Sequence, residues 1–199
     1  MVTDDELSEL VARVARWALG AKCRLVTAES CTGGWIAKVF TDAAGSSRWF
    51  ERGYVTYSNA AKLRDLGVSE RTLEEHGAVS EATVREMARG ALSMTGAEVS
   101  IAVSGIAGPD GGSAEKPVGT VWFCVGRRLG AAVGVHRGAP EAVADAGARG
   151  GARAAVGDAP PSDFELVTAG ALFGGNREAV RRASVQRALE LVLQFEKRF

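Results

Sequence analysis

The feature that most constrains the fold is an alternation of short, apolar, β-rich segments with amphipathic helical segments. Helices separate the early strands, whereas the later strands follow one another, and this order favours a mixed sheet. We therefore expect an α/β protein, a single three-layer α/β/α domain covering residues 1–199. The expected strands are 24–28, 53–58, 98–103, 118–125, 130–136 and 164–172, and the expected helices are 4–19, 31–42, 59–67, 70–75, 80–95 and 177–197. Thr3 and Glu6 predict a capping box at the start of the first helix, and we expect Asn59 to cap the third.

Charge and composition exclude several classes of protein. The chain carries 24 acidic and 24 basic side chains, so we expect no nucleic-acid partner. No apolar run reaches the ~18 residues of a membrane span, so we expect no membrane association. The acidic start MVTDDELSEL does not resemble a signal peptide, and the three cysteines lack metal-type spacing. These observations predict a cytoplasmic protein with reduced thiols and no bound metal.

Residues 138–163 differ from the rest of the chain. They are rich in Ala and Gly, include three prolines and contain no large apolar side chain. A segment of this composition has little to bury, so we expect a flexible insertion at the surface.

The stretch TAESCTGG joins an expected strand to an expected helix. Such a junction exposes a side chain at the carboxyl edge of a sheet, so Ser30 is a candidate nucleophile. Alternatively, Ser30 or Thr32 only caps the following helix. Gly33 and Gly34 would let a ligand approach the backbone closely. Cys31 is a rival nucleophile, but without a histidine in its local sequence we expect a packed thiol.

A nucleophilic serine needs a base, and neither His76 nor His136 lies in a glycine-rich or otherwise site-like stretch. A desolvated lysine can take this role, because burial lowers its pKa. Lys62 is the best candidate, since it follows the aromatic strand GYVTYS, where Tyr57 and Ser58 are close enough to orient it. The alternative is an ordinary solvated lysine on a short helix.

Two further stretches have the composition of ligand-binding segments. The loop SGIAGPDGGSAEKP follows an expected buried strand, and its amide groups are suited to an anion, although a tight connection is the alternative. It lacks the endings of the common nucleotide-binding motifs, and its carboxylates Asp110 and Glu115 are weak evidence for a metal. FGGNREAVRRA places Arg177, Arg181 and Arg182 at the start of the last helix, which suits a phosphate or simply a solvated basic face.

The order of AESCTGG, AGSSRWFERGYVTYSNAAK, GAVSE and SGIAGPDGGSAEKPVGTVWF resembles the CinA C-terminal domain family. The resemblance covers about residues 5–137 and resumes near 164–195. It implies a stand-alone nicotinamide-nucleotide amidohydrolase. Such an enzyme converts nicotinamide mononucleotide (NMN) to nicotinate mononucleotide and ammonia without a cofactor. The resemblance also makes a homodimer plausible.

The resemblance assigns roles to particular residues. Ser30 falls on the family's nucleophile, Lys62 on its general base, and Tyr57 in a supporting position. Backbone amides at the start of the 31–42 helix or in the 104–108 loop would hold the oxyanion. The substrate-binding residues implied are Thr32, Gly33, Gly34, Ser104, Gly105, Gly108 and Arg177.

One departure from the family pattern keeps a second class of function open. The family usually has Gly-Asp-Arg at the start of the last helix, and this chain has Gly175-Asn176-Arg177. Loss of the carboxylate puts the phosphate contact of Arg177 in question. The alternative is a catalytically weak module that binds a nucleotide or a partner.

Overall fold

A computed structural model of the chain describes residues 2–129 and 163–196. Its five strands form one mixed sheet in the order β2-β1-β3-β4-β5. β1 pairs in parallel with β2 and β3, whereas β4 is antiparallel to both β3 and β5. The strands are β1 (Leu25–Glu29), β2 (Phe50–Val55), β3 (Val99–Gly105), β4 (Thr120–Arg128) and β5 (Phe164–Leu172).

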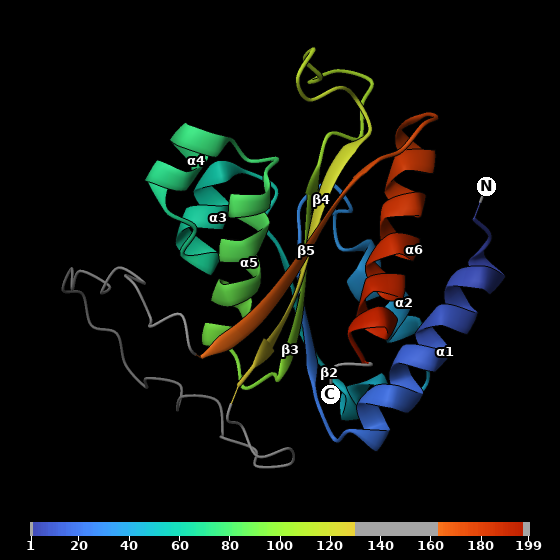
Figure 1. Cartoon of the computed structure of the whole chain (residues 1–199). Coiled ribbons are helices and arrows are strands. Elements are labelled where there is room, and N and C mark those ends of the chain that lie inside the picture. The colour runs from blue at the N-terminus through green and yellow to red at the C-terminus, as the bar shows by residue number, and fades with distance from the viewer. Residues whose placement is uncertain (1, 130–162, 197–199) are drawn as a thin grey trace, which may run out of the picture.

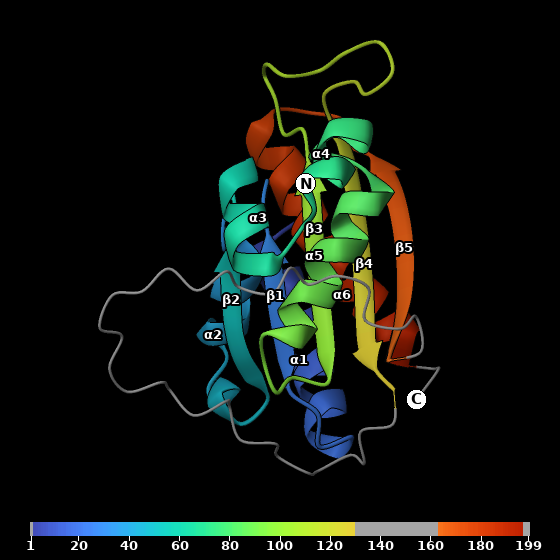
Figure 2. The same ribbon diagram turned by 90° about the vertical axis from the view of Figure 1, so that its left-hand side faces the viewer.

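Helices cover both faces of this sheet, which confirms the predicted three-layer arrangement (Figure 1). On one face lie α3 (Asn59–Leu66), α4 (Glu70–His76) and α5 (Glu81–Ser93). The other face carries α1 (Asp4–Gly20), α2 (Trp35–Asp42) and α6 (Arg177–Phe195), and a short 3-10 turn, Ser46–Arg48, precedes β2. Figure 2 views the sheet from the α3–α5 side and shows the strand order directly.

The apolar pattern of the strands follows from these layers. Every residue of β1 and nearly every residue of β3 is buried, as expected for central strands that are covered on both faces. One hydrophobic cluster packs between the sheet and α1, α2 and α6, and a second packs beneath α5. No residue of the edge strand β5 is fully buried.

The expected helix starts are partly confirmed. Thr3 and Glu6 form the predicted capping box of α1, and the Ser80 hydroxyl accepts from the Thr83 amide at the start of α5. Asn59 is not the cap of α3. The Ser58 hydroxyl accepts from the Ala61 amide instead, so the helix proper begins at Asn59.

Several boundaries differ from the sequence prediction, among them that of the strand expected at 118–125, which is β4, Thr120–Arg128. The helix expected from residue 31 begins only at Trp35, because residues 31–34 form a turn in which Gly33 and Gly34 have φ of 62° and 90°. The strand expected at 53–58 is β2, Phe50–Val55, since its pairing with β1 starts at Leu25 and Phe50. The strand expected at 130–136 and residues 138–162 of the expected insertion lie outside the described residues.

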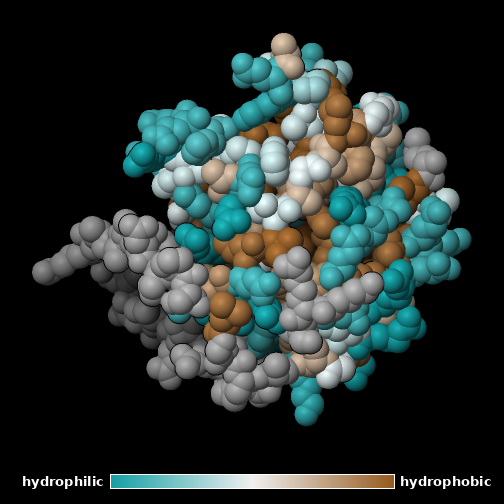
Figure 3. All heavy atoms as spheres, viewed as in Figure 1, coloured by the Kyte–Doolittle hydropathy of each residue, from teal (hydrophilic) through white to brown (hydrophobic). Residues whose placement is uncertain are grey.

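Apolar side chains gather on the surface along the strip between the two helical layers, where β5 forms the edge of the sheet (Figure 3). Leu172, the last residue of β5, is 66% exposed. Within residues 2–129 and 163–196, none of the helices is both long and apolar enough to span a bilayer. The homodimer expected from the resemblance stays a prediction.

Candidate active site

Ser30 lies directly after β1 at the carboxyl edge of the parallel strands. Its amide donates to the carbonyl of Val103 on the neighbouring strand at 3.0 Å, so the backbone is fixed there. The side chain is only 8% exposed. The hydroxyl is not a helix cap, because the N-cap of α2 is Gly34 and no side chain caps that end.

Lys62 reaches Ser30 from the second turn of α3. Its ammonium nitrogen Nζ lies 3.0 Å from Ser30 Oγ and also donates to the carbonyls of Thr56, at 2.8 Å, and Tyr57, at 3.3 Å. Lys62 is 1% exposed, although a lysine on a short polar helix is usually solvated. No carboxylate pairs with it within the part of the chain that the structure describes.

Burial lowers the pKa of Lys62 to about 8, because removing the amine from water disfavours its charged form. A neutral amine has two N–H groups and one lone pair. If the two N–H groups donate to the carbonyls of Thr56 and Tyr57, the lone pair remains for the Ser30 hydroxyl. The arrangement therefore suits a base that takes a proton from Ser30.

Ser30 and Lys62 open onto a cavity of about 260 Å³. Its walls come from the turn after β1, from α3 and the segment before it, from the α4–α5 connection, from the end of β3 and the loop after it, and from the start of α6. Segments far apart in the sequence thus meet at one sheet edge. Of the predicted site residues, the cavity brings together Ser30, Tyr57, Lys62, Ser104, Gly105, Gly108 and Arg177.

Arg177 and Tyr57 form the exposed part of this wall. The guanidinium donates to the Tyr57 hydroxyl at 2.9 Å and to the Gly108 carbonyl at 2.7 Å. Tyr57 is 60% exposed. Asn176 caps α6, since its Oδ1 accepts from the Ala179 amide at 2.9 Å, so the amide performs the capping that an aspartate would perform.

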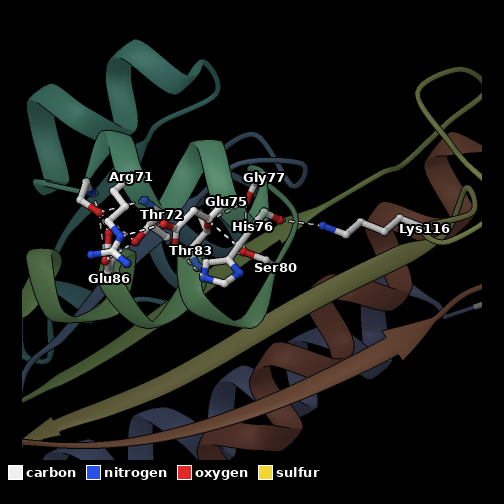
Figure 4. Close-up of polar contacts among 10 residues, drawn as sticks. Arg71, Thr72, Glu75, His76, Gly77, Ser80, Thr83, Glu86 and Lys116 are labelled. Atoms are coloured by element: carbon white, nitrogen blue, oxygen red, sulfur yellow. Dashed lines mark hydrogen bonds and ion pairs between the residues drawn. The ribbon is translucent and has the colours of Figure 1, made fainter.

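The end of β3 and the loop after it are each held against the end of α4 or the α4–α5 connection by one hydrogen bond. Ser104 Oγ donates to the Ala78 carbonyl at 2.6 Å, and Lys116 Nζ donates to the His76 carbonyl at 2.7 Å. Figure 4 shows Lys116 reaching across to the end of α4. The same view shows Glu86 of α5, whose carboxylate accepts from Thr72 Oγ1 at 2.6 Å and ties α4 to α5. These contacts tie α4 to α5 and hold β3 and its following loop beside the α4–α5 connection, which forms one wall of the cavity.

Three of the predicted binding residues do not line this cavity. Thr32 is fully buried, and its hydroxyl donates to Glu29 at 2.7 Å. Gly33 and Gly34 face a second, more open cavity of about 450 Å³ beside Trp35 and Arg182. Gly33 and Gly34 belong to the turn before α2, which begins only at Trp35. In this turn they face the second cavity rather than the one at Ser30.

Glu29 is a site residue that sequence reasoning missed. Its carboxylate is fully buried and accepts from the Thr27 and Thr32 hydroxyls and from the amides of Ile36 and Ala37. The Glu29 carboxylate therefore accepts the hydrogen bonds of the free amides in the first turn of α2. Because the Ile36 and Ala37 amides already donate to Glu29, they are not available to an oxyanion. The signal in the sequence was a lone acid in an apolar strand, just before a helix whose cap position is glycine.

Cys31 also lines the cavity but is a poor nucleophile. Burial raises the pKa of its thiol to about 12, which leaves almost no thiolate near neutral pH. No cluster of side chains suited to a metal ion occurs among residues 2–129 and 163–196. The chemistry available is that of a hydroxyl, an amine and a set of backbone amides.

The fold and the cavity define a three-layer α/β protein whose sheet edge holds a buried serine–lysine pair. Comparison with known proteins gives the family. The chain belongs to the CinA C-terminal domain family, whose model matches residues 7–141.

Some curated relatives match along nearly their whole length. The nicotinamide-nucleotide amidohydrolase PncC of Escherichia coli K12 is 47% identical over 193 residues, covering 97% of this chain and 96% of that protein. The protein of the same name from Pseudomonas putida is 42% identical over 190 residues, covering 96% and 97%. The crystal structure of the competence/damage inducible protein CihA from Agrobacterium tumefaciens aligns with a TM-score of 0.75 at 36% identity, covering 98% and 96%.

Proposed function

We propose that this protein is a serine amidohydrolase that converts NMN to nicotinate mononucleotide and ammonia, with Ser30 as nucleophile and Lys62 as general base. The observation that carries the proposal is the 3.0 Å contact between Lys62 Nζ and Ser30 Oγ in a buried setting. Two relatives that align over nearly their whole length are named nicotinamide-nucleotide amidohydrolases, which supports the choice of substrate. We further propose that residues 1–199 act as a single domain.

In the first half-reaction, neutral Lys62 accepts the Ser30 proton while Ser30 Oγ attacks the carboxamide carbon. Protonated Lys62 then gives that proton to the leaving amine, which departs as ammonia and leaves an ester on Ser30. In the second half-reaction, water attacks the ester, Lys62 takes a proton from that water, and the proton returns to Ser30. Nicotinate mononucleotide is released.

The oxyanion of each tetrahedral intermediate needs donors that are not already engaged. Ile36 and Ala37 donate to Glu29, and the Ile106 amide donates to the Thr120 carbonyl at 2.9 Å. Ala107 and Gly108 line the cavity, and none of the described residues accepts a hydrogen bond from their amides. We propose these two amides as the oxyanion donors.

Arg177 is the cavity residue best suited to the phosphate of the nucleotide. Its guanidinium is bonded to a hydroxyl and a carbonyl rather than to a carboxylate, so its charge is not neutralised by those contacts. Tyr57 supports the reaction by holding Arg177 at the cavity mouth. Binding the remote phosphate would position the amide and reject free nicotinamide.

Ammonia release from NMN tests the proposal. The wild-type protein should release one ammonia per nicotinate mononucleotide formed, and Ser30→Ala and Lys62→Arg should each lose at least ~10³-fold in kcat while remaining folded. Tight NMN binding without ammonia release from the wild type would support the nucleotide-binding module instead. The Asn176 departure does not favour that alternative, because the amide keeps the helix cap and Arg177 stays at the cavity.

A further inference from the structure

Arg181 of α6 holds the turn that immediately follows Ser30. Its Nε donates to the Cys31 carbonyl at 3.0 Å, and its Nη2 donates to the Thr32 carbonyl at 2.7 Å. The guanidinium also stacks on Trp35, with its carbon 5.2 Å from the ring centre. One side chain, about 150 positions away in the sequence, therefore contacts both the turn after Ser30 and the first residue of α2.

This turn needs support from outside. Residues 31–34 belong to neither β1 nor α2, and α2 has no side-chain cap at Gly34. Glu29 holds the inner side through the Thr32 hydroxyl and the amides of α2. Arg181 holds the other side through the carbonyls. The two contacts leave Thr32 fixed by both its side chain and its backbone.

We propose that Arg181 is a positioning residue that keeps the Ser30 hydroxyl aligned with Lys62 by fixing the Cys31–Thr32 turn. The inference rests on the proposed function of Ser30. Arg181 does not touch the reacting atoms and does not line the Ser30 cavity. Its effect is on the geometry of attack, and a misplacement of about 1 Å in such a site costs on the order of 10²-fold in rate.

The neighbouring arginines have other roles, which makes the assignment specific. Arg182 stacks on the same Trp35 ring at 4.9 Å but pairs with Asp4 and donates to the Val2 carbonyl, so it holds α1 rather than the turn. Arg177 faces the cavity. Lysine cannot replace Arg181 fully, because one ammonium does not reproduce the fork that reaches two carbonyls.

The kinetic test compares Arg181→Ala with Arg182→Ala. For Arg181→Ala we expect kcat for ammonia release from NMN to fall about 10- to 100-fold while KM changes less than threefold. Added guanidinium ion should restore part of that kcat by filling the vacated site. Arg182→Ala should keep kcat within about threefold of wild type, and guanidinium should not affect it. Equal kcat in Arg181→Ala and wild type would overturn the proposal.

A second measurement does not depend on the substrate. A fluorophosphonate probe labels activated serines, and mass spectrometry of the labelled peptide identifies Ser30. We expect Arg181→Ala to be labelled at least tenfold more slowly than wild type, and Arg181→Lys to fall between them. If Arg181→Ala does not fold, the labelling rate of Arg181→Lys tests the proposal. Slower labelling of Ser30 than in wild type supports the positioning role, and an equal rate overturns it.

The outcomes separate the two hypotheses. Ser30 labelled at the same rate in wild type and in both Arg181 variants overturns the positioning role and leaves the proposed nucleophile intact. A wild-type protein that is neither labelled at Ser30 nor active on NMN overturns the proposed function and the positioning role with it.

Discussion

Lys62 Nζ lies 3.0 Å from Ser30 Oγ, and the two residues are 32 positions apart on different elements of the fold. The amine is almost fully buried, and the carbonyls of Thr56 and Tyr57 accept its other hydrogen bonds. Burial lowers the pKa of this amine to about 8, because removal from water disfavours its charged form. Because Lys62 belongs to α3, the packing of this helix determines whether the amine reaches Ser30 Oγ.

The pH dependence of activity should report Lys62. Because the pKa of the buried amine is about 8 and the neutral form is the base, kcat/KM should rise with pH and level off above about 8. Below pH 7 it should fall about tenfold per unit, as the amine becomes protonated. A pH–rate profile measures this limb. His76→Gln and His136→Gln are the controls, and loss of the limb in either variant would contradict the assignment to Lys62.

Glu29→Gln should destabilise the fold. The buried carboxylate accepts four hydrogen bonds, two from hydroxyls and two from the first turn of α2, and an amide offers one acceptor oxygen in place of two. We expect a loss of about 2–3 kcal/mol in the free energy of unfolding, measured by urea denaturation. Glu74→Gln, at an exposed position on α4, should change it by less than about 0.5 kcal/mol. Equal stability of both variants would show that Glu29 does not hold α2.

Gly90→Ala should disturb the packing that places Lys62. A methyl group at Gly90 of α5 would lie 1.8 Å from the Leu66 carbonyl oxygen at the end of α3, so one of the helices must move. We expect a loss of about 3 kcal/mol or more and a large drop in kcat in whatever protein remains folded. Gly20→Ala is the matched control, since nothing lies within 4 Å of a methyl group there and alanine favours helix. A Gly90→Ala protein as stable as Gly20→Ala would contradict the close contact between α3 and α5.

Arg177→Ala should weaken the binding of NMN specifically. If the guanidinium contacts the phosphate, KM for NMN should rise about tenfold or more, while turnover of the nucleoside without the phosphate should change little. Tyr57→Phe removes one hydrogen bond to Arg177 and should give a smaller rise in KM. Arg187→Ala, farther along the same helix, should match wild type. Equal losses for NMN and for the nucleoside would place the phosphate elsewhere.

Much of the fold followed from the sequence, because buried strands and amphipathic helices have distinct periods. The boundaries that failed did so for local reasons. Gly33 and Gly34 adopt positive φ and delay α2, and Ser58 caps α3 in place of Asn59. The periodicity of hydrophobic residues predicts neither the late start of α2 nor the cap of α3.

The site was less accessible to sequence reasoning. The pattern of α3 favours a solvated Lys62. The lack of a suitable histidine made Lys62 the best candidate base, and the resemblance to a family assigned it that role. Its burial depends on how α3 packs against α5, which the sequence of α3 does not specify. Glu29 and Arg181 were missed as supports of the Ser30 turn for the same reason, since their partners are backbone groups whose positions appear only in the folded chain.

The most direct test of the central claim is to trap the covalent intermediate. The protein is mixed with NMN, quenched in acid within one turnover, and mapped by peptide mass spectrometry. We expect an acyl ester on Ser30 that carries the nicotinate mononucleotide group and is absent from Ser30→Ala. An adduct on Cys31, or steady turnover by Ser30→Ala at the wild-type rate, would contradict it.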